Sequence, residues 1–132
     1  MTGFYGQRNA PEVIRHAVRG VADESIRVVS QVPQDWQVHH GALVTVVGDG
    51  TPSQGRYTTT ENVRIAVYHR FEPSARRIAQ QIDAFLLNPR TTWGFFISPG
   101  PGLISARDDG LGAWVCAVTV VAESPKEGVQ LT

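Results

Sequence analysis

The chain has 132 residues and a mass of 14.4 kDa, which corresponds to one domain at about 150 residues per domain. Its twelve basic and twelve acidic residues cancel. This argues against a high-affinity nucleic-acid binder, because such proteins normally carry a basic surplus. One cysteine excludes an internal disulfide framework, and no apolar run is long enough to span a membrane. Residues 1–10 are polar and lack the apolar core of a signal peptide, so we expect a protein that folds in a cytoplasm.

The first element that the sequence predicts is a helix. Asn9, Pro11 and Glu12 combine a capping residue, a proline and an early acid, as is typical of a helix start. The apolar residues that follow lie on one helical face and predict an amphipathic helix over 11–22: Val13, Ile14, Ala17, Val18 and Val21. We expect the 132 residues to form a single domain made of an N-terminal arm, a folded core and a C-terminal tail, over residues 1–10, 11–123 and 124–132.

Three segments rich in β-branched residues then predict strands: Ile26–Val32, Ala42–Val47 and Val63–His69. In the third segment apolar and other residues alternate, which indicates a strand buried on one face. The polar segment Gly48–Thr60 joins the second and third strands. It is too long for a tight hairpin, so we expect a functional or mobile loop there.

A second helix is predicted to begin at Glu72-Pro73 and to end at Asn88-Pro89, with an apolar face that packs on the sheet: Ala75, Ile78, Ala79, Ile82, Phe85 and Leu86. A strand over Trp93–Ser98, an irregular stretch over Leu103–Gly112 and a long strand over Ala113–Glu123 follow. The order α-β-β-β-α-β-β predicts an α+β fold, a mainly antiparallel sheet of about five strands with both helices packed on one face.

No group of residues predicts catalysis, a metal site or a cofactor site. The segment Gly50–Tyr57 has two glycines at the spacing of a phosphate-binding loop but lacks the lysine and the metal-binding hydroxyl of that motif. His39 and His40 are neighbours in a polar loop, so they point apart and we expect both to be solvated. We expect Cys116 to be a small core residue and not a nucleophile, because the sequence places no histidine base beside it.

Three features keep more than one interpretation each. Asp108-Asp109, between Arg107 and Gly110, is typical of a turn, but paired carboxylates also suit a divalent metal or a salt bridge at an interface rim. Eleven of the twelve basic residues are arginine, which reflects either a GC-rich genome or an oligomer interface, because guanidinium groups are easier to desolvate than ammonium groups. The third is a group of aromatic residues that belong either to the core or to a contact with a partner subunit: Trp93, Phe95, Phe96 and Trp114.

The second half of the chain resembles a known family. The resemblance lies in the strand Val63–His69, the helix that opens at Pro73–Ala79 and ends at Ala84–Leu87, the turn Pro99–Leu103, the loop Arg107–Gly110 and the long last strand. These segments resemble the tail terminator proteins of long-tailed bacteriophages, the minor tail protein U type, especially those from phages of actinobacteria. The resemblance covers about residues 11–122. Head–tail joining and tail completion proteins have related folds and similar lengths.

The resemblance implies a structural virion protein without enzymatic activity, assembled in the cytoplasm of a bacterial host. Such a terminator forms a hexameric ring with copies of itself on the last ring of the tail tube protein, stops further polymerisation and presents a surface to the head–tail connector. DNA passes through its lumen without specific binding. Two alternatives stay open: a head–tail joining, neck or tail completion protein, and a small ligand-binding or enzymatic α+β domain unrelated to phages.

For a ring, the residues that we expect at interfaces are charged or aromatic side chains of the second helix and of the two irregular segments: Arg76, Arg77, Arg107, Asp108, Asp109, Arg56 and Tyr57. We expect Arg76 or Arg77 to pair with Asp108 or Asp109 of the adjacent subunit. The loop Gly48–Thr60 is expected to become ordered on the neighbouring subunit or on the tube.

Overall fold

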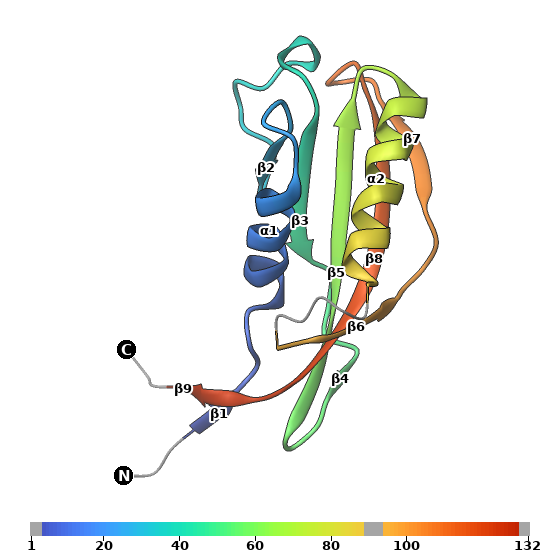
Figure 1. The fold of residues 1–132 in the computed structure, drawn as a ribbon. Helices are drawn as coiled ribbons and strands as arrows, with labels where there is room; N and C mark the ends of the chain where they lie inside the picture. The colour runs from blue at the N-terminus through green and yellow to red at the C-terminus, as the bar shows by residue number, and fades with distance from the viewer. Residues whose placement is uncertain (1–3, 89–93, 130–132) are drawn as a thin grey trace.

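The computed structural model describes residues 4–88 and 94–129 and has the predicted α+β fold, with two helices and a mainly antiparallel sheet (Figure 1). In chain order the elements are β1 (Phe4–Gly6), α1 (Ala10–Val21), β2 (Arg27–Val29), a 3₁₀ turn (Val38–His40), β3 (Leu43–Gly48), β4 (Ser53–Gln54), β5 (Thr58–His69), α2 (Glu72–Leu86), β6 (Phe96–Pro99), β7 (Ile104–Asp108), β8 (Ala113–Pro125) and β9 (Glu127–Val129).

The central sheet has the strand order β2-β3-β5-β8-β6. In addition β4 pairs with β5 on the same edge as β3, and β7 pairs with β8 on the same edge as β6. Only the β2–β3 pair is parallel among these described strands. The long strands β5 and β8 pair over their whole common length, from Thr58 opposite Pro125 to His69 opposite Trp114. This ladder is the spine of the molecule.

Both helices cover the same face of the sheet, as predicted. In α1 the Asn9 Oδ1 accepts a hydrogen bond from the Glu12 backbone N–H at 3.3 Å, and Pro11 occupies the first turn, where its missing N–H costs nothing. The side chains that the two helices bury in the main core, with strand residues such as Val63, Ile65 and Val67, are Ala10, Ile14 and Val18 of α1 and Ala75, Ile78, Ala79, Ile82 and Leu86 of α2. Phe85, expected in this face, is only half-buried.

The other face of the sheet carries a smaller apolar cluster at one end. Trp36, Leu43 and Ala113 are its buried members, and the Trp36 and Tyr68 rings meet edge to face with centroids 6.1 Å apart. The chain between β2 and β3 folds over this end and supplies Trp36. The predicted alternation of the third strand is confirmed, because Arg64 and Tyr68 lie on this face while Ile65 and Val67 lie under the helices.

The prediction of a loop over Gly48–Thr60 is wrong for its second half. β4 pairs with the first residues of β5, Ser53 opposite Thr60 and Gln54 opposite Thr59, so the strand predicted over Val63–His69 begins at Thr58. Its threonines are β-branched and suit an extended backbone, and β8 supplies their partners on the other edge. The hairpin extends beyond the layer of helices (Figure 1).

The stretch Leu103–Gly112, predicted to be irregular, contains the edge strand β7, which pairs with the first residues of β8. Apolar and polar residues alternate only weakly in this stretch, because most of its side chains are exposed. Its strand conformation therefore depends on the pairing with β8. Two predicted strands are shorter: Ile26–Val32 contains only β2, and the one over Trp93–Ser98 is observed as β6. Trp93 and Pro89 lie outside the described residues.

The segments expected to be an arm and a tail form strands. β8 runs to Pro125, and β9 then pairs with β1 in an antiparallel ribbon in which Phe4 faces Val129 and Gly6 faces Glu127. Neither segment shows a pattern of its own, because each is short and exposed. Their pairing depends on contact between the two ends of the sequence.

Candidate interface surfaces

No group of three or more His, Cys, Asp or Glu side chains within residues 4–88 and 94–129 is arranged to hold a metal ion. His40 Nδ1 accepts a hydrogen bond from the Gln37 backbone N–H at 3.1 Å and helps to close the 3₁₀ turn. Both histidines are exposed, but the prediction that they point apart is wrong: in this turn their rings meet edge to face with centroids 4.5 Å apart. Neither helix of the described chain has the length and apolar character that crossing a bilayer requires.

The turn between β7 and β8 holds three of the predicted interface residues. Asp108 Oδ1 accepts a hydrogen bond from the Leu111 backbone N–H at 3.0 Å, so its carboxylate stabilises the turn, as turn chemistry predicts. Arg107 Nε lies 3.7 Å from Asp109 Oδ1, and the Arg107 guanidinium lies over the Trp114 ring at 5.7 Å. The side chain of Asp109 is 94% exposed. This turn presents one tethered and one solvated carboxylate.

Arg76 belongs to a hydrogen-bond network that joins α2 to β7. Its Nε donates to Glu72 Oε1 at 3.0 Å, and its Nη2 donates to Ser105 Oγ at 3.3 Å. Ser105 Oγ also donates to Glu72 Oε1 at 3.0 Å. The hydrogen bond from Arg76, followed by that from Ser105, lowers the pKa of Glu72. Arg76 is thus already paired within its own subunit.

Cys116, on β8, contributes the last group of the network formed by Glu72, Arg76 and Ser105. Its Sγ lies 3.1 Å from Ser105 Oγ, and the thiol is buried. Because the Ser105 hydroxyl proton is used toward Glu72, the thiol is the donor of this contact. The arrangement supports the interpretation of Cys116 as a core residue.

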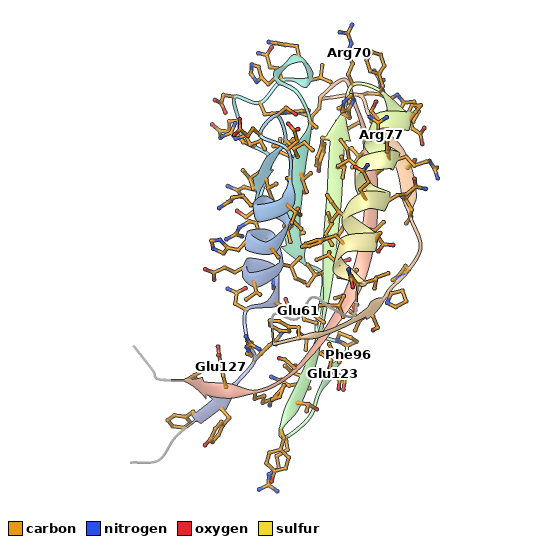
Figure 2. All side chains as sticks on the ribbon, in the orientation of Figure 1. Glu61, Arg70, Arg77, Phe96, Glu123 and Glu127 are labelled. Carbon is orange, nitrogen blue, oxygen red and sulfur yellow. The ribbon has the colours of Figure 1, made fainter. Side chains whose placement is uncertain are left out.

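Arg77 points to a different surface from Arg76. It is exposed at the end of the molecule where β5 passes into α2, and Figure 2 shows it at the same end as Arg70. His69 Nδ1 accepts a hydrogen bond from the Phe71 backbone N–H at 2.9 Å, and burial, followed by the positive charge of Arg77, lowers the pKa of His69. Phe71 is 58% exposed. The two neighbouring arginines therefore serve different environments.

Arg56 and Tyr57 form the tip of the β4–β5 hairpin, at the opposite end of β5 from Arg77. The Arg56 guanidinium lies 5.7 Å from the centre of the Tyr57 ring, and Tyr57 is 74% exposed. The Lys126 backbone N–H donates to the Tyr57 carbonyl at 2.8 Å. With Tyr5 and Pro125 these residues border an open cleft of about 500 Å³. Sequence reasoning missed Tyr5 and Lys126 because it assigned them to an arm and a tail.

Arg8 fixes the β1–β9 ribbon to the body of the molecule. Its Nη1 donates to the Gly94 carbonyl at 2.6 Å, its guanidinium lies 4.4 Å from the centre of the Phe95 ring, and its Nε lies 3.7 Å from Glu127 Oε2. Gly94 has a φ of +78°, and a Cβ there would collide with Arg8. Phe95 is thus a core residue.

A second contact at this end joins Gln7 and Glu61. Gln7 Nε2 donates to Glu61 Oε1 at 2.8 Å, and burial raises the pKa of this carboxyl group. Phe96, by contrast with Phe95, is 73% exposed, and Figure 2 shows it near Glu123 at the same end as the ribbon. Phe95 therefore belongs to the core, and the contact of Phe96 with a partner subunit stays a prediction.

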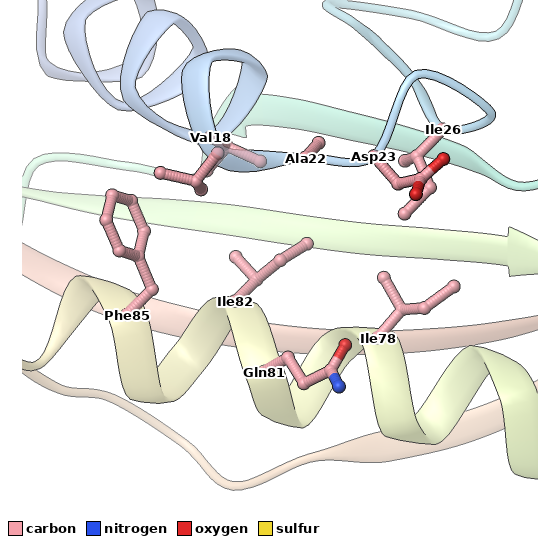
Figure 3. Close-up of a pocket in the computed structure, with 9 residues that line it drawn as sticks. Val18, Ala22, Asp23, Ile26, Ile78, Gln81, Ile82 and Phe85 are labelled. Carbon is pink, nitrogen blue, oxygen red and sulfur yellow. The ribbon is translucent and has the colours of Figure 1, made fainter.

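An apolar groove of about 340 Å³ runs between the two helices (Figure 3). Its lining comes from the end of α1, the turn after it and one side of α2: Val18, Val21, Ala22, Asp23, Ile26, Ile78, Gln81, Ile82 and Phe85. Asp23 accepts a hydrogen bond from the Ser25 backbone N–H at 2.9 Å, which lowers its pKa. The sequence pattern predicted the helix faces but not the gap between them, which depends on how far apart the helices lie.

The structure thus separates the seven predicted interface residues into two groups. Those of α2 and of the β7–β8 turn lie toward one end of the sheet, and those of the hairpin lie at the other. Arg76 has its partners within its own subunit, which the spacing of Glu72 and Arg76, four residues apart on a helix, could have indicated.

No protein-family model matches the sequence, and no curated protein matches it. Among solved structures, a chain from the virion of a native gene transfer agent particle has a similar fold, with a TM-score of 0.54 and 14% sequence identity. The similarity covers 86% of this chain and 84% of that chain. At this identity it shows a shared fold over nearly the whole length of both chains.

Proposed function

We propose that the protein is a structural virion protein without enzymatic activity, a tail terminator that forms a ring on the end of a phage tail tube. The observation that carries the proposal is the fold shared with a chain of a gene transfer agent virion over 86% of this chain. The resemblance of residues 11–122 to tail terminators supports the finer assignment. In this role the ring stops polymerisation of the tube and presents its other side to the head–tail connector.

The distribution of surfaces supports a ring. A ring requires two different lateral surfaces on each subunit, because a heterologous contact closes only when unlike surfaces meet. The hairpin and the β1–β9 ribbon lie at one end of the sheet, while Arg70, Arg77 and the β7–β8 turn lie at the other (Figures 1 and 2). A net charge of zero suits a lumen through which DNA passes without specific binding. We infer six copies per ring from the same resemblance.

The proposal is tested by removing the gene from the phage that carries it and imaging the particles by electron microscopy. A terminator is expected to leave overlong, headless tails, because nothing stops tube growth. Tails of normal length beside unjoined heads would overturn the terminator assignment in favour of a head–tail joining adaptor. Normal particles would overturn the virion role altogether. Supplying the intact gene in trans is the control, since it must restore particles of normal tail length.

A further inference from the structure

The tip of the β4–β5 hairpin is a preorganised projection. The Gly55 backbone N–H donates to the Thr58 carbonyl at 2.8 Å, so Arg56 and Tyr57 are the two residues of a tight turn. The Arg56 guanidinium lies over the exposed Tyr57 ring, and the hairpin projects from the helix-covered body (Figure 1). Tyrosine and arginine are the residue types that most often dominate binding at the centre of interfaces. We call this pair, Arg56 and Tyr57, the knob.

The interhelical groove is a receptor of complementary chemistry. Figure 3 shows Val18 and Ile26 on one wall and Ile78, Ile82 and Phe85 on the other. Two polar side chains, Asp23 and Gln81, complete a lining that is otherwise apolar. Val21, which also lines the groove, is 58% exposed, so the apolar surface continues from the groove onto the end of α1.

Charge complementarity connects the two surfaces. The ion pairs within residues 4–88 and 94–129 join Arg8 to Glu127, Arg76 to Glu72 and Arg107 to Asp109. Neither Arg56 nor Asp23 belongs to these pairs, and each lies beside exposed apolar surface. A cation stacked on an aromatic ring therefore has a chemical complement in an apolar groove that carries a carboxylate.

We propose that the knob of one copy docks into the interhelical groove of a second copy, with the Tyr57 ring among the apolar side chains and the Arg56 guanidinium directed to Asp23. Knob and groove are different surfaces of one chain, so each subunit gives its knob to one neighbour and receives that of another. The inference rests on the proposed ring-forming function and names the lateral contact of that ring.

The β7–β8 turn is another acidic surface toward which Arg56 could be directed, and it is less suited. Asp109 is paired with Arg107 at 3.7 Å, whereas Asp23 belongs to none of the ion pairs within residues 4–88 and 94–129. The groove beside the turn also has aliphatic side chains in its lining, among them Ile104 and Val115. Arg64 and Arg107 line it too, and their positive charges oppose that of the Arg56 guanidinium. Transfer of a tyrosine ring from water is therefore more favourable into the interhelical groove than to the surface beside the turn, because the lining of the interhelical groove is more apolar.

Chemical cross-linking of the purified chain tests this contact. The single natural cysteine, Cys116, is buried, so engineered thiols react without background. Thr58→Cys places a thiol beside the knob without altering it, and Gln81→Cys places one in the groove. The matched control is Gln80→Cys, which changes the same residue type one position away on α2, exposed but outside the groove. A short bis-maleimide captures even a short-lived contact, because the linkage is irreversible.

We expect Thr58→Cys with Gln81→Cys in one chain to give a ladder of linked multimers, and Thr58→Cys with Gln80→Cys to remain largely monomeric. Adding Tyr57→Ala should lower the yield about tenfold, as expected for truncating a central aromatic residue. Asp23→Lys should lower the rate about fivefold, and Arg56→Glu added to it should restore part of that rate. No ladder, or equal ladders from the two cysteine pairs, would overturn the contact.

The outcome is separable from that of the gene removal. A missing ladder together with overlong tails would overturn this contact and leave the terminator assignment standing. A ladder together with normal particles would leave the self-association standing and overturn the virion role. Circular dichroism of each cysteine variant establishes that the chain is folded before its cross-linking is compared.

Discussion

The two halves of the β5–β8 ladder share their strands but not their surroundings. In the half beneath the helices, Ile65 and Val67 of β5 are fully buried. In the other half Thr58–Thr60 pair with Glu123–Pro125, no helix lies over them, and most of their side chains are polar. Backbone pairing is continuous, but apolar burial ends midway. The covered half therefore holds most of the stability, and the uncovered half offers a stiff, extended surface to other chains.

The largest expected effect comes from Ile65→Ala, in the covered half of β5. Ile65 is fully buried, so its truncation leaves a cavity and should lower the free energy of unfolding by about 2–5 kcal/mol. Thr60→Ala, on the same strand in the uncovered half, should cost about 1 kcal/mol or less. Urea unfolding of both variants measures the contrast. Equal losses would mean that the two halves contribute alike.

Arg8→Ala should detach the ribbon while leaving the covered half intact. The variant loses the bond to the Gly94 carbonyl and the contact with Phe95, which together stabilise the ribbon by about 1.5–3 kcal/mol. Amide hydrogen exchange of β1 and β9 should therefore accelerate about tenfold or more, with that of β5 residues beneath the helices unchanged. Arg8→Lys is the matched control for charge, and it should recover only part of the protection. Unchanged exchange in the ribbon would show that other contacts hold it.

Charge reversal tests the two neighbouring arginines of α2, Arg76 and Arg77, toward the end of the sheet opposite the hairpin. Arg77→Glu should weaken ring formation by about 1 kcal/mol per contact if Arg77 faces Asp108 or Asp109 of the next subunit, with more lost where the contact excludes water. Arg76→Glu alone should act mainly within the subunit, because it places a carboxylate beside Glu72. Sedimentation of each variant with tail tubes measures ring formation.

A second charge reversal, on the β7–β8 turn, tests whether the arginines contact that turn of the next subunit. Asp108→Arg with Asp109→Arg should restore part of the assembly lost by Arg76→Glu with Arg77→Glu. Normal assembly of the variant with Arg76→Glu and Arg77→Glu would mean that neither arginine takes part in a contact between subunits.

The smallest expected effect concerns the pKa of His69. Burial is the main reason that this pKa lies below 6.5, and the charge of Arg77 is the second. Arg77→Gln should raise the pKa measured by NMR titration but leave it below 6.5, and Arg76→Gln should not change it. Because the folded pKa is the lower one, His69 contributes stability above pH 6.5 that is lost as the pH falls through the folded value. A pKa that does not respond to Arg77→Gln would place Arg77 farther from the imidazole than the structure does.

Patterns that repeat within one element were predictable from the sequence. The spacing of Ile14 and Val18, and of Ile78 and Ile82, is enough to define both helix faces, since helical periodicity depends only on local geometry. The turn role of Asp108 also follows from local chemistry. What escaped prediction depends on distant partners: β1 requires β9, β7 requires β8, and the interhelical groove requires the final distance between two helices.

One consequence follows from the length of β8. Its thirteen residues form one continuous strand that extends for about 40 Å from the β7–β8 turn to the ribbon, with no loop or helix between that could lengthen under load. A pull on the ribbon end, directed along the strand against the rest of the sheet, loads the β5–β8 ladder in shear. Twelve residue pairs then resist together, whereas a pull across the strands would open them one after another. A load along this axis is therefore resisted better than one across the strands, and it reaches the other end of the ladder without first unfolding a connecting segment.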